Sequence, residues 1–132
     1  WSVSRSNDAK LAQTALVRAL NARRPRPGLL HHTDRGSPYA ALAYTAILRQ
    51  NGAVSSMSRA GDCYDNAVVE SFFGTLKTEL GSERVYPSRL VAEAVISDYI
   101  ENFYNPQRRH SHLQYVSPIE FELRAKAAAV AA

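Results

Sequence analysis

The chain has 132 residues, of which 45% are hydrophobic and 21% charged, so it can form one globular domain with a modest core. Sixteen lysines and arginines against 12 aspartates and glutamates give a net charge of +4, which favours a polyanionic partner only weakly. The single cysteine excludes an internal disulfide and indicates a reducing compartment, and no apolar run approaches the ~20 residues of a membrane span.

The first third of the chain predicts a strand, a helix and a second strand. Residues 1–4 alternate large and small side chains as a strand does, and a start at tryptophan rather than methionine indicates a fragment of a longer protein. Side-chain oxygens at 6–8 cap a helix, which the segment NARRPRPG at 21–28 ends. Residues 29–33 then predict a buried strand that leads directly into Asp34. The apolar face of the helix consists of Ala12, Leu16, Ala19 and Leu20.

The middle of the chain predicts two helices with a strand between them. One helix begins near Pro38 and ends at Asn51-Gly52, where glycine allows a left-handed stop. A strand at 53–58 and a polar loop precede a helix at 66–80, which Gly81 ends. The first helix presents Tyr39, Ala43, Ala46 and Ile47 on one side. In the second helix, apolar residues recur at three- and four-residue steps and predict a buried stripe of Val69, Phe72, Phe73, Leu76 and Leu80.

The last third predicts two further helices. One starts near Ser88 and ends at Asn105-Pro106, and the basic connector QRRHSH follows. The segment SPIE at 117–120 is a capping box that starts the last helix, whose alanine-rich end at 125–132 we expect to fray. This order of elements predicts an α/β domain in which helices cover a small sheet.

Two acidic residues stand where an α/β fold builds sites. Asp34 follows a strand, and Glu70 lies in the first turn of the helix after the next strand, with 35 residues between them. Two such carboxylates can hold Mg²⁺ or Mn²⁺, which prefer oxygen ligands. Lys77, two helical turns after Glu70, can then neutralise a DNA phosphate. Taken singly, each residue has a simpler explanation: Asp34 as a turn residue, Glu70 as a partner of the helix dipole and Lys77 as a solvated lysine.

The histidines and arginines allow other interpretations. His31 and His32 point to opposite faces of a strand, so only one could join His110 and His112 at a zinc site, and no third ligand stands at motif spacing. His32 shares a face with Asp34 and could donate a hydrogen bond near it. Two basic clusters can contact phosphates or simply be solvated: Arg23, Arg24 and Arg26, and then Arg108, Arg109, His110 and His112.

The segments HTDRGSPY, DCYDNAVVESFFGTLKTEL and YIENFYNPQRRHSHLQYVSPIEF closely resemble the catalytic half of bacterial transposases of insertion-sequence family 3. The resemblance runs from Trp1 to about Arg124 and implies the RNase H-like fold of the retroviral-integrase core, with its triad of acids. It makes Asp34 the second acid, Glu70 the third and Lys77 the basic residue seven positions later. Asn66 falls in the same motif, where it could orient the metal site or the DNA.

The resemblance also implies a gap, because the family's first aspartate lies on a central strand upstream of this chain. We therefore expect an N-terminally truncated core at 1–124 with a tail at 125–132, inactive on its own. Three other acids could substitute for the missing one, although cap and turn roles fit them better: Asp8, Asp62 and Asp65.

The implied function is metal-dependent DNA cleavage and strand transfer in the bacterial cytoplasm, with two Mg²⁺ or Mn²⁺ ions, DNA as partner and a homo-oligomeric active complex. Further DNA contacts are expected from Arg35, Arg108, Arg109 and His110. The alternative from another class is a non-catalytic DNA-binding module or a decayed transposase remnant, and a zinc hydrolase is a third possibility.

Overall fold

A computed structural model describes residues 1–59 and 64–131 of the chain. It divides into two compact units, Trp1–Val85 and Tyr86–Ala132. Among the described residues, no helix is both long enough and apolar enough to cross a membrane.

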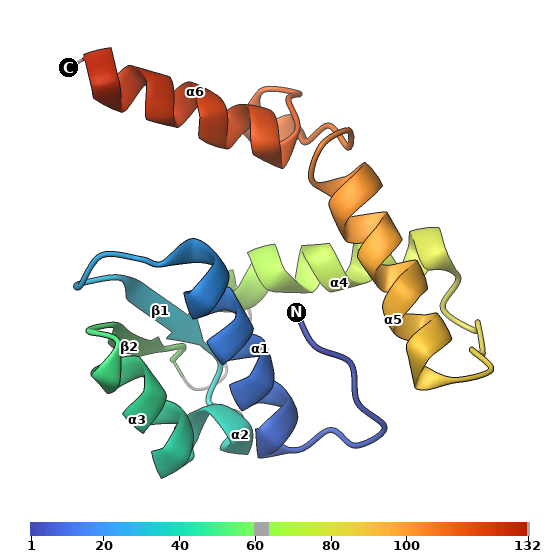
Figure 1. The fold of residues 1–132 in the computed structure, drawn as a ribbon, viewed down its shortest axis with the longest axis horizontal. Coiled ribbons are helices and arrows are strands. Elements are labelled where there is room, and N and C mark those ends of the chain that lie inside the picture. The colour runs from blue at the N-terminus through green and yellow to red at the C-terminus, as the bar shows by residue number, and fades with distance from the viewer. Residues whose placement is uncertain (60–63, 132) are drawn as a thin grey trace. The chain divides into compact units, whose positions relative to one another are not determined.

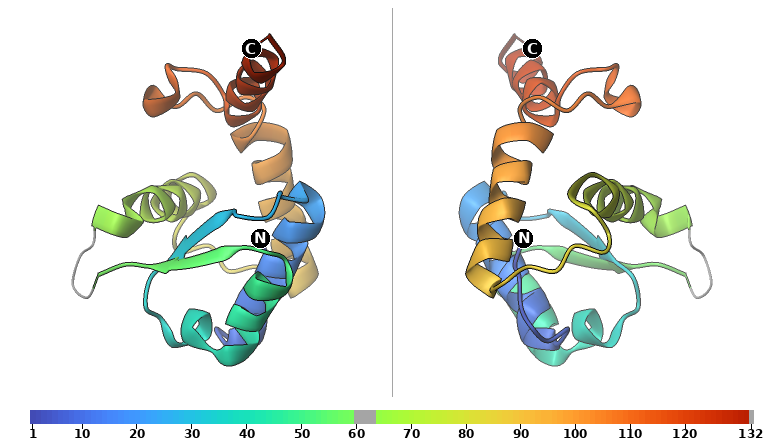
Figure 2. Two further views of the ribbon diagram at one scale, coloured as in Figure 1. Left: turned by 90° about the vertical axis from the view of Figure 1, so that its left-hand side faces the viewer. Right: turned by 90° about the vertical axis from the view of Figure 1, so that its right-hand side faces the viewer.

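The described part of the first unit contains a two-stranded parallel sheet and four α-helices (Figure 1). Its elements are α1 (Ala9–Arg23), β1 (Leu30–Thr33), α2 (Ser37–Ala40), α3 (Leu42–Gln50), β2 (Val54–Met57), the 3₁₀ turn η1 (Tyr64–Asn66) and α4 (Ala67–Leu80). Leu30 pairs with Val54 and Thr33 with Met57, so the two strands lie in register over their whole length. Because parallel strands need a crossover, α2 and α3 form the connection between them. Figure 2 shows these two helices on one side of the strands and α4 on the other.

The core of this unit lies where α1 packs on α3. It consists of Leu16, Leu20, Tyr44 and Leu48, and Leu48 is only 2% exposed. The predicted N-cap of α1 is confirmed, because a carboxylate oxygen of Asp8 accepts a hydrogen bond from the backbone N–H of Leu11 at 2.9 Å. The core thus fixes α1 beside the crossover and leaves the far end of β1 free to carry Asp34.

One predicted helix is two helices in the structure. The chain is extended at Ala41, with φ −61° and ψ 137°, and this separates α2 from α3. The break shifts the phase of the second helix, so the buried side chains of α3 are Tyr44 and Leu48 rather than the predicted Ala43 and Ala46. The predicted stop is confirmed, since Gly52 has a φ of +66°.

Three predictions of burial or pairing are wrong for the described residues. Residues 1–4 form no strand, because no neighbouring strand pairs with them there. Strand β1 is not buried: Leu30 is 64% exposed, since β2 is its one partner in the described sheet. Helix α4 has the predicted bounds but no buried residue, and Phe73 of its apolar stripe is 49% exposed. The apolar pattern was recognised correctly, but the surrounding elements do not cover it.

The second unit is helical. Its elements are α5 (Arg89–Asp98), the π-helical turn η2 (Tyr99–Tyr104), the 3₁₀ turn η3 (Ser111–Leu113) and α6 (Pro118–Ala131). The predicted cap at Ser117 is confirmed, because its hydroxyl accepts from Glu120 N–H at 3.2 Å, and the helix predicted to start near Ser88 is capped by that residue, whose hydroxyl accepts from Val91 N–H at 3.3 Å. Fraying at 125–132 stays a prediction, as does the 1–124 domain. The buried apolar residues of this unit are Ala92, Tyr99, Ile100 and Val116.

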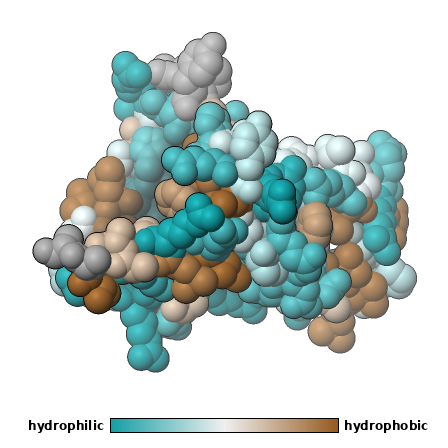
Figure 3. Space-filling view, turned by 90° about the horizontal axis from the view of Figure 1, so that it is seen from above, coloured by the Kyte–Doolittle hydropathy of each residue, from teal (hydrophilic) through white to brown (hydrophobic). Residues whose placement is uncertain are grey.

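Apolar side chains also reach the surface. Figure 3 shows them as brown patches between polar ones on the face that it draws. Several are large and strongly exposed: Leu42, Val68, Val85, Leu90 and Tyr115.

Candidate functional site

Asp34 lies directly after β1, and the turn that follows holds its side chain. Carboxylate Oδ1 accepts a hydrogen bond from the backbone N–H of Gly36 at 2.7 Å. A Cβ atom on residue 36 would lie 2.8 Å from that oxygen, so only glycine leaves the carboxylate in this position. Asp34 is exposed, and within the described residues its Oδ2 has no hydrogen-bond partner and can bind a cation.

Glu70 and Lys77 both project from α4. Glu70 lies in the first turn, where the helix dipole favours a negative charge, and Lys77 lies two turns further along. Both side chains are exposed. Two full turns of an α-helix return to almost the same face, so the acid and the base flank one stretch of the helix surface.

A cleft of about 860 Å³ in the first unit brings these residues together. Asp34 enters it from the end of β1, and Glu70 and Lys77 enter it from α4. Its apolar wall comes mainly from α1 and α4 and includes Ala12, Leu16, Leu20, Val69 and Phe73. The cleft therefore joins two acids, a lysine and an apolar wall, and His32 and Asn66 also line it.

The cleft contains carboxylate oxygens, the donor type that Mg²⁺ and Mn²⁺ prefer. Mg²⁺ is commonly bound through one or two carboxylates, with water and phosphate completing its shell. Asp34 and Glu70 provide that minimum. Within residues 1–59 and 64–131, no three histidine, cysteine or acidic side chains are grouped so that they could hold a metal ion.

The other candidate acids have different roles in the structure. Asp8 caps α1, and its hydrogen bonds from the Leu11 N–H and the Ser6 hydroxyl hold the pKa of that carboxyl below its usual value. Asp65 accepts from the backbone N–H of Arg59 at 3.1 Å and pairs with its guanidinium at 3.8 Å. Asp62 lies outside the described residues.

Asn66 and Arg35 both contact Ser58, a residue that the sequence pattern did not single out. Asn66 Nδ2 donates to the Ser58 hydroxyl oxygen at 2.7 Å, and Arg35 Nε donates to the Ser58 carbonyl at 2.8 Å. Ser58 is 3% exposed and directly follows β2. Ser58 does not stand out in the sequence as a functional residue, because a serine after a strand usually belongs to a turn.

The two adjacent histidines do face different surroundings. His32 lies with Nδ1 2.9 Å from Ser56 Oγ and Nε2 3.3 Å from Ser58 Oγ. His31 instead contacts the buried Tyr44, with Nε2 3.0 Å from the phenol oxygen. Burial, and secondarily the charge of His32, lowers the pKa of His31, and burial raises the pKa of Tyr44 to about 12.

The basic cluster at 108–112 belongs to the second unit and is ordered by aromatic rings. The Arg108 guanidinium lies 5.6 Å from the centre of the Tyr104 ring. The His110 ring meets Tyr104 edge-on at 4.9 Å, and the backbone N–H of His110 donates to Val116 at 3.2 Å. Arg109 is exposed. This cluster is a folded loop on the π-helical turn.

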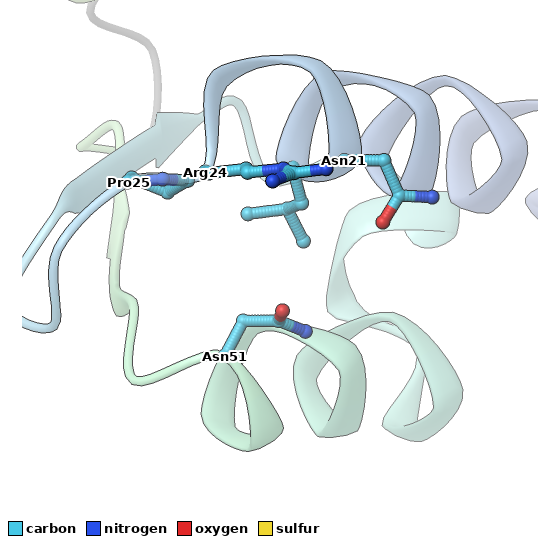
Figure 4. Close-up of a pocket in the computed structure, with 5 residues that line it drawn as sticks. Asn21, Arg24, Pro25 and Asn51 are labelled. Carbon is cyan, nitrogen blue, oxygen red and sulfur yellow. The ribbon is translucent and has the colours of Figure 1, made fainter.

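A smaller cavity of about 350 Å³ lies at the C-terminal end of α1 (Figure 4). Asn21 and Arg24 line it from the end of α1, and Asn51 lines it from the end of α3. Helix C-termini carry partial negative charge, which Arg24 complements. This cavity contains no acidic residue and offers no comparable chemistry.

Comparisons with family models and with individual proteins indicate the same family. Two family models, each described as "Integrase core domain", match residues 51–118 and 1–63. The transposase for insertion sequence element IS904 of Lactococcus lactis is 47% identical over 92% of this chain and 48% of its own length. The transposase InsF for insertion sequence IS3A of Escherichia coli is 43% identical over 92% of this chain and 42% of its own length.

Two further matches extend this result. An insertion element IS600 protein of 31 kDa from Shigella sonnei is 53% identical over 85% of this chain and 41% of its own length. The chain thus spans less than half the length of these relatives. A solved intasome of simian T-cell lymphotropic virus, in complex with the B56 gamma regulatory subunit of PP2A, shares the fold with a TM-score of 0.66 at 16% identity, over 89% of this chain and 41% of its own. The chain belongs to the integrase core domain family, and the relatives named above include transposases of insertion sequences.

Proposed function

We propose that this chain is the carboxyl-terminal part of a transposase core of the three-acid type, which cleaves DNA and transfers its strands. The observation that carries the proposal is that Asp34, Glu70 and Lys77 line one cleft. Membership of a family whose relatives are named transposases supports it. The DNA would be that of the transposon ends and the target.

The two carboxylates are the proposed metal ligands. Asp34, held by the Gly36 N–H, and Glu70, at the start of α4, would hold Mg²⁺ or Mn²⁺. Such ions, when bound, activate an attacking oxygen and stabilise the leaving oxygen in phosphoryl transfer. No side-chain nucleophile is needed, because the attacking oxygen belongs to water or to a DNA 3′-hydroxyl.

Lys77 is the proposed phosphate contact. Its ammonium group faces the same cleft as the acids and can bind a phosphate oxygen next to the reacting bond. Asn66 and Arg35 are proposed to contact DNA with the donors that Ser58 does not engage, and Arg108, Arg109 and His110 with the basic loop of the second unit. An active complex of several copies would supply the two DNA ends with one site each.

A third carboxylate is expected from a segment outside these 132 residues. The cleft contains only two acids among the described residues, whereas the proposed chemistry uses three. We therefore expect the 132-residue chain alone to bind Mn²⁺ weakly and to cut no DNA.

Manganese binding and DNA cleavage test this function in two steps. Electron paramagnetic resonance of free Mn²⁺ should show binding to the 132-residue chain that Glu70→Gln abolishes and Glu83→Gln, an exposed acid that does not line the cleft, leaves unchanged. The complete gene product that contains these residues should nick a transposon-end duplex with Mn²⁺, and its Glu70→Gln variant should not. Equal nicking by both would refute the assignment of Glu70, and nicking by the 132 residues alone would refute the need for a third acid.

A non-catalytic DNA-binding module is the second candidate, favoured by the presence of only two acids in the cleft. It predicts salt-dependent DNA binding with no dependence on Glu70 and no metal-dependent cleavage by the complete gene product. Retention of Asp34, Glu70 and Lys77 around one cleft favours the catalytic function.

A further inference from the structure

Ser58 holds the chain on both sides of Asp34. Its backbone N–H donates to the carbonyl oxygen of Thr33 at 2.9 Å, and its own carbonyl accepts from Arg35 Nε at 2.8 Å. Thr33 and Arg35 are the residues immediately before and after Asp34. The end of β1 is therefore fixed to the end of β2 at the point where the acid projects.

The Ser58 hydroxyl uses its full hydrogen-bonding capacity. It donates to the Thr33 carbonyl at 3.2 Å, accepts from Asn66 Nδ2 at 2.7 Å and lies 3.3 Å from His32 Nε2. A hydroxyl has one proton and two lone pairs, so when the Ser58 proton is given to Thr33 the second lone pair can accept from His32 in the tautomer that carries Nε2–H. His32 Nδ1 then accepts from the hydroxyl of Ser56 at 2.9 Å.

The same hydroxyl reaches the start of α4. Asn66 is the residue immediately before that helix, and Glu70 lies in its first turn. We propose that Ser58 is a positioning residue: its buried hydroxyl sets the spacing between the strand end that carries Asp34 and the helix start that carries Glu70. This inference rests on the proposed function for its catalytic meaning, but the mechanical link can be measured without metal or DNA.

Removing the hydroxyl should loosen the first turn of α4. In Ser58→Ala, Asn66 Nδ2 and His32 Nε2 lose a buried acceptor, and polar groups left without partners in a protein interior are costly. The amides of residues 71–74 donate to the carbonyls of 67–70, so their hydrogen exchange reports opening of this turn. We expect them to exchange about tenfold faster relative to the α1 amides, and we expect the Mn²⁺ dissociation constant to rise about tenfold.

Two further variants make the comparison specific. Ser55→Ala removes an exposed hydroxyl from β2 that does not line the cleft, and it should change neither exchange at 71–74 nor Mn²⁺ binding. Asn66→Ala removes the same link from the other side, and it should accelerate exchange at 71–74 as Ser58→Ala does. If Ser58→Ala does not fold, Asn66→Ala decides the question.

The possible results distinguish the positioning role of the Ser58–Asn66 hydrogen bond from the existence of the metal site. Faster exchange at 71–74 in Ser58→Ala or Asn66→Ala, with α1 amides and Ser55→Ala unchanged, supports the positioning role. Unchanged exchange at 71–74, or an equal change in Ser55→Ala, overturns it. If the wild-type chain binds no Mn²⁺ that depends on Glu70, the proposed metal site fails, while the exchange data still decide whether Ser58 fixes the start of α4.

Discussion

Gly36→Ala should move the Asp34 carboxylate without unfolding the chain. The added Cβ would lie 2.8 Å from Asp34 Oδ1, about 0.6 Å closer than the shortest ordinary van der Waals contact of 3.4 Å. The oxygen is the end of an exposed side chain, so it can rotate away, and the hydrogen bond from the residue 36 N–H at 2.7 Å is then lost. The backbone at Gly36, with φ −56° and ψ 141°, is open to alanine.

The effect on stability should be small because two terms oppose each other. Losing the exposed hydrogen bond costs about 1 kcal/mol, and replacing glycine by alanine lowers the entropy of the unfolded chain by an equivalent of about 0.4–1 kcal/mol. The free energy of unfolding should therefore change by less than about 1 kcal/mol. The Mn²⁺ affinity should fall about tenfold, since one of two carboxylate ligands leaves its position.

Urea unfolding and Mn²⁺ titration of the same preparation would test this expectation, and the amide proton shift of residue 36 would report the lost hydrogen bond. Gly74→Ala is a control for the glycine-to-alanine change itself, because its Cβ meets no atom within 4 Å, and the readout compared is the residue 36 amide because Gly74 also lines the cleft. As a helix-interior change it should stabilise α4 by about 0.5–1 kcal/mol and leave the amide shift of residue 36 unchanged. An unchanged Mn²⁺ affinity and amide shift in Gly36→Ala would refute the reasoning, as would a loss of stability above about 2 kcal/mol.

Three further predictions concern the core. Leu48→Ala should lower the free energy of unfolding by about 3 kcal/mol in urea titrations, because Leu48 is 2% exposed and the substitution leaves a cavity, whereas a loss below about 1 kcal/mol would contradict its place in the core. Burial lowers the pKa of His31, so the folded state favours the neutral ring. Its contribution to the free energy of unfolding should be fully present above about pH 6.5 and should be lost as the pH drops below that value. In His31→Gln the free energy of unfolding should depend less on pH in this range. Burial raises the pKa of Tyr44 from 10 to about 12, so stability should be lost as the pH rises from 10 to 12, and Tyr44→Phe should remove this loss.

Helix ends were the best-predicted feature, because their signals are local. Asp8 and Ser117 each accept a hydrogen bond from a backbone N–H three residues later, as the sequence predicted, and Ser88 does the same where a helix start was expected. Gly52 takes the expected left-handed conformation. A cap requires only a few consecutive residues, so neighbouring elements scarcely affect it.

Burial was predicted less well, because it depends on residues distant in sequence. The apolar spacing of α4 is real, yet Phe73 lines an open cleft and is half-exposed. The break at Ala41 could not be read from the apolar pattern, and it moved the buried face of α3 to Tyr44 and Leu48. Periodicity identifies a helix face that can be buried, whereas the partner that covers it is a property of the fold.

The candidate site, like the fold, could be predicted from the sequence only in part. Asp34, Glu70 and Lys77 were found from their spacing and from family resemblance, and the structure places them around one cleft. Ser58 was missed, because its partners lie between positions 32 and 66 and come from β1, the following turn and the start of α4. Only the pairing of β1 with β2 brings these groups within hydrogen-bond distance.

The two acids are held by different physical means. Asp34 is fixed locally, by the N–H of a residue two positions away, whereas among the described residues Glu70 has no hydrogen-bond partner and takes its position from α4. No side chain of α4 is fully buried in the described structure, although Phe72, Leu76 and Leu80 are half-buried. The bond from Asn66 to the buried Ser58 is therefore one restraint on the helix start that carries Glu70, beside the contact of Asp65 with Arg59. We therefore expect that substituting the polar residue at the end of β2 changes the positions of Asp34 and Glu70 more than substituting apolar residues along the exposed stripe of α4.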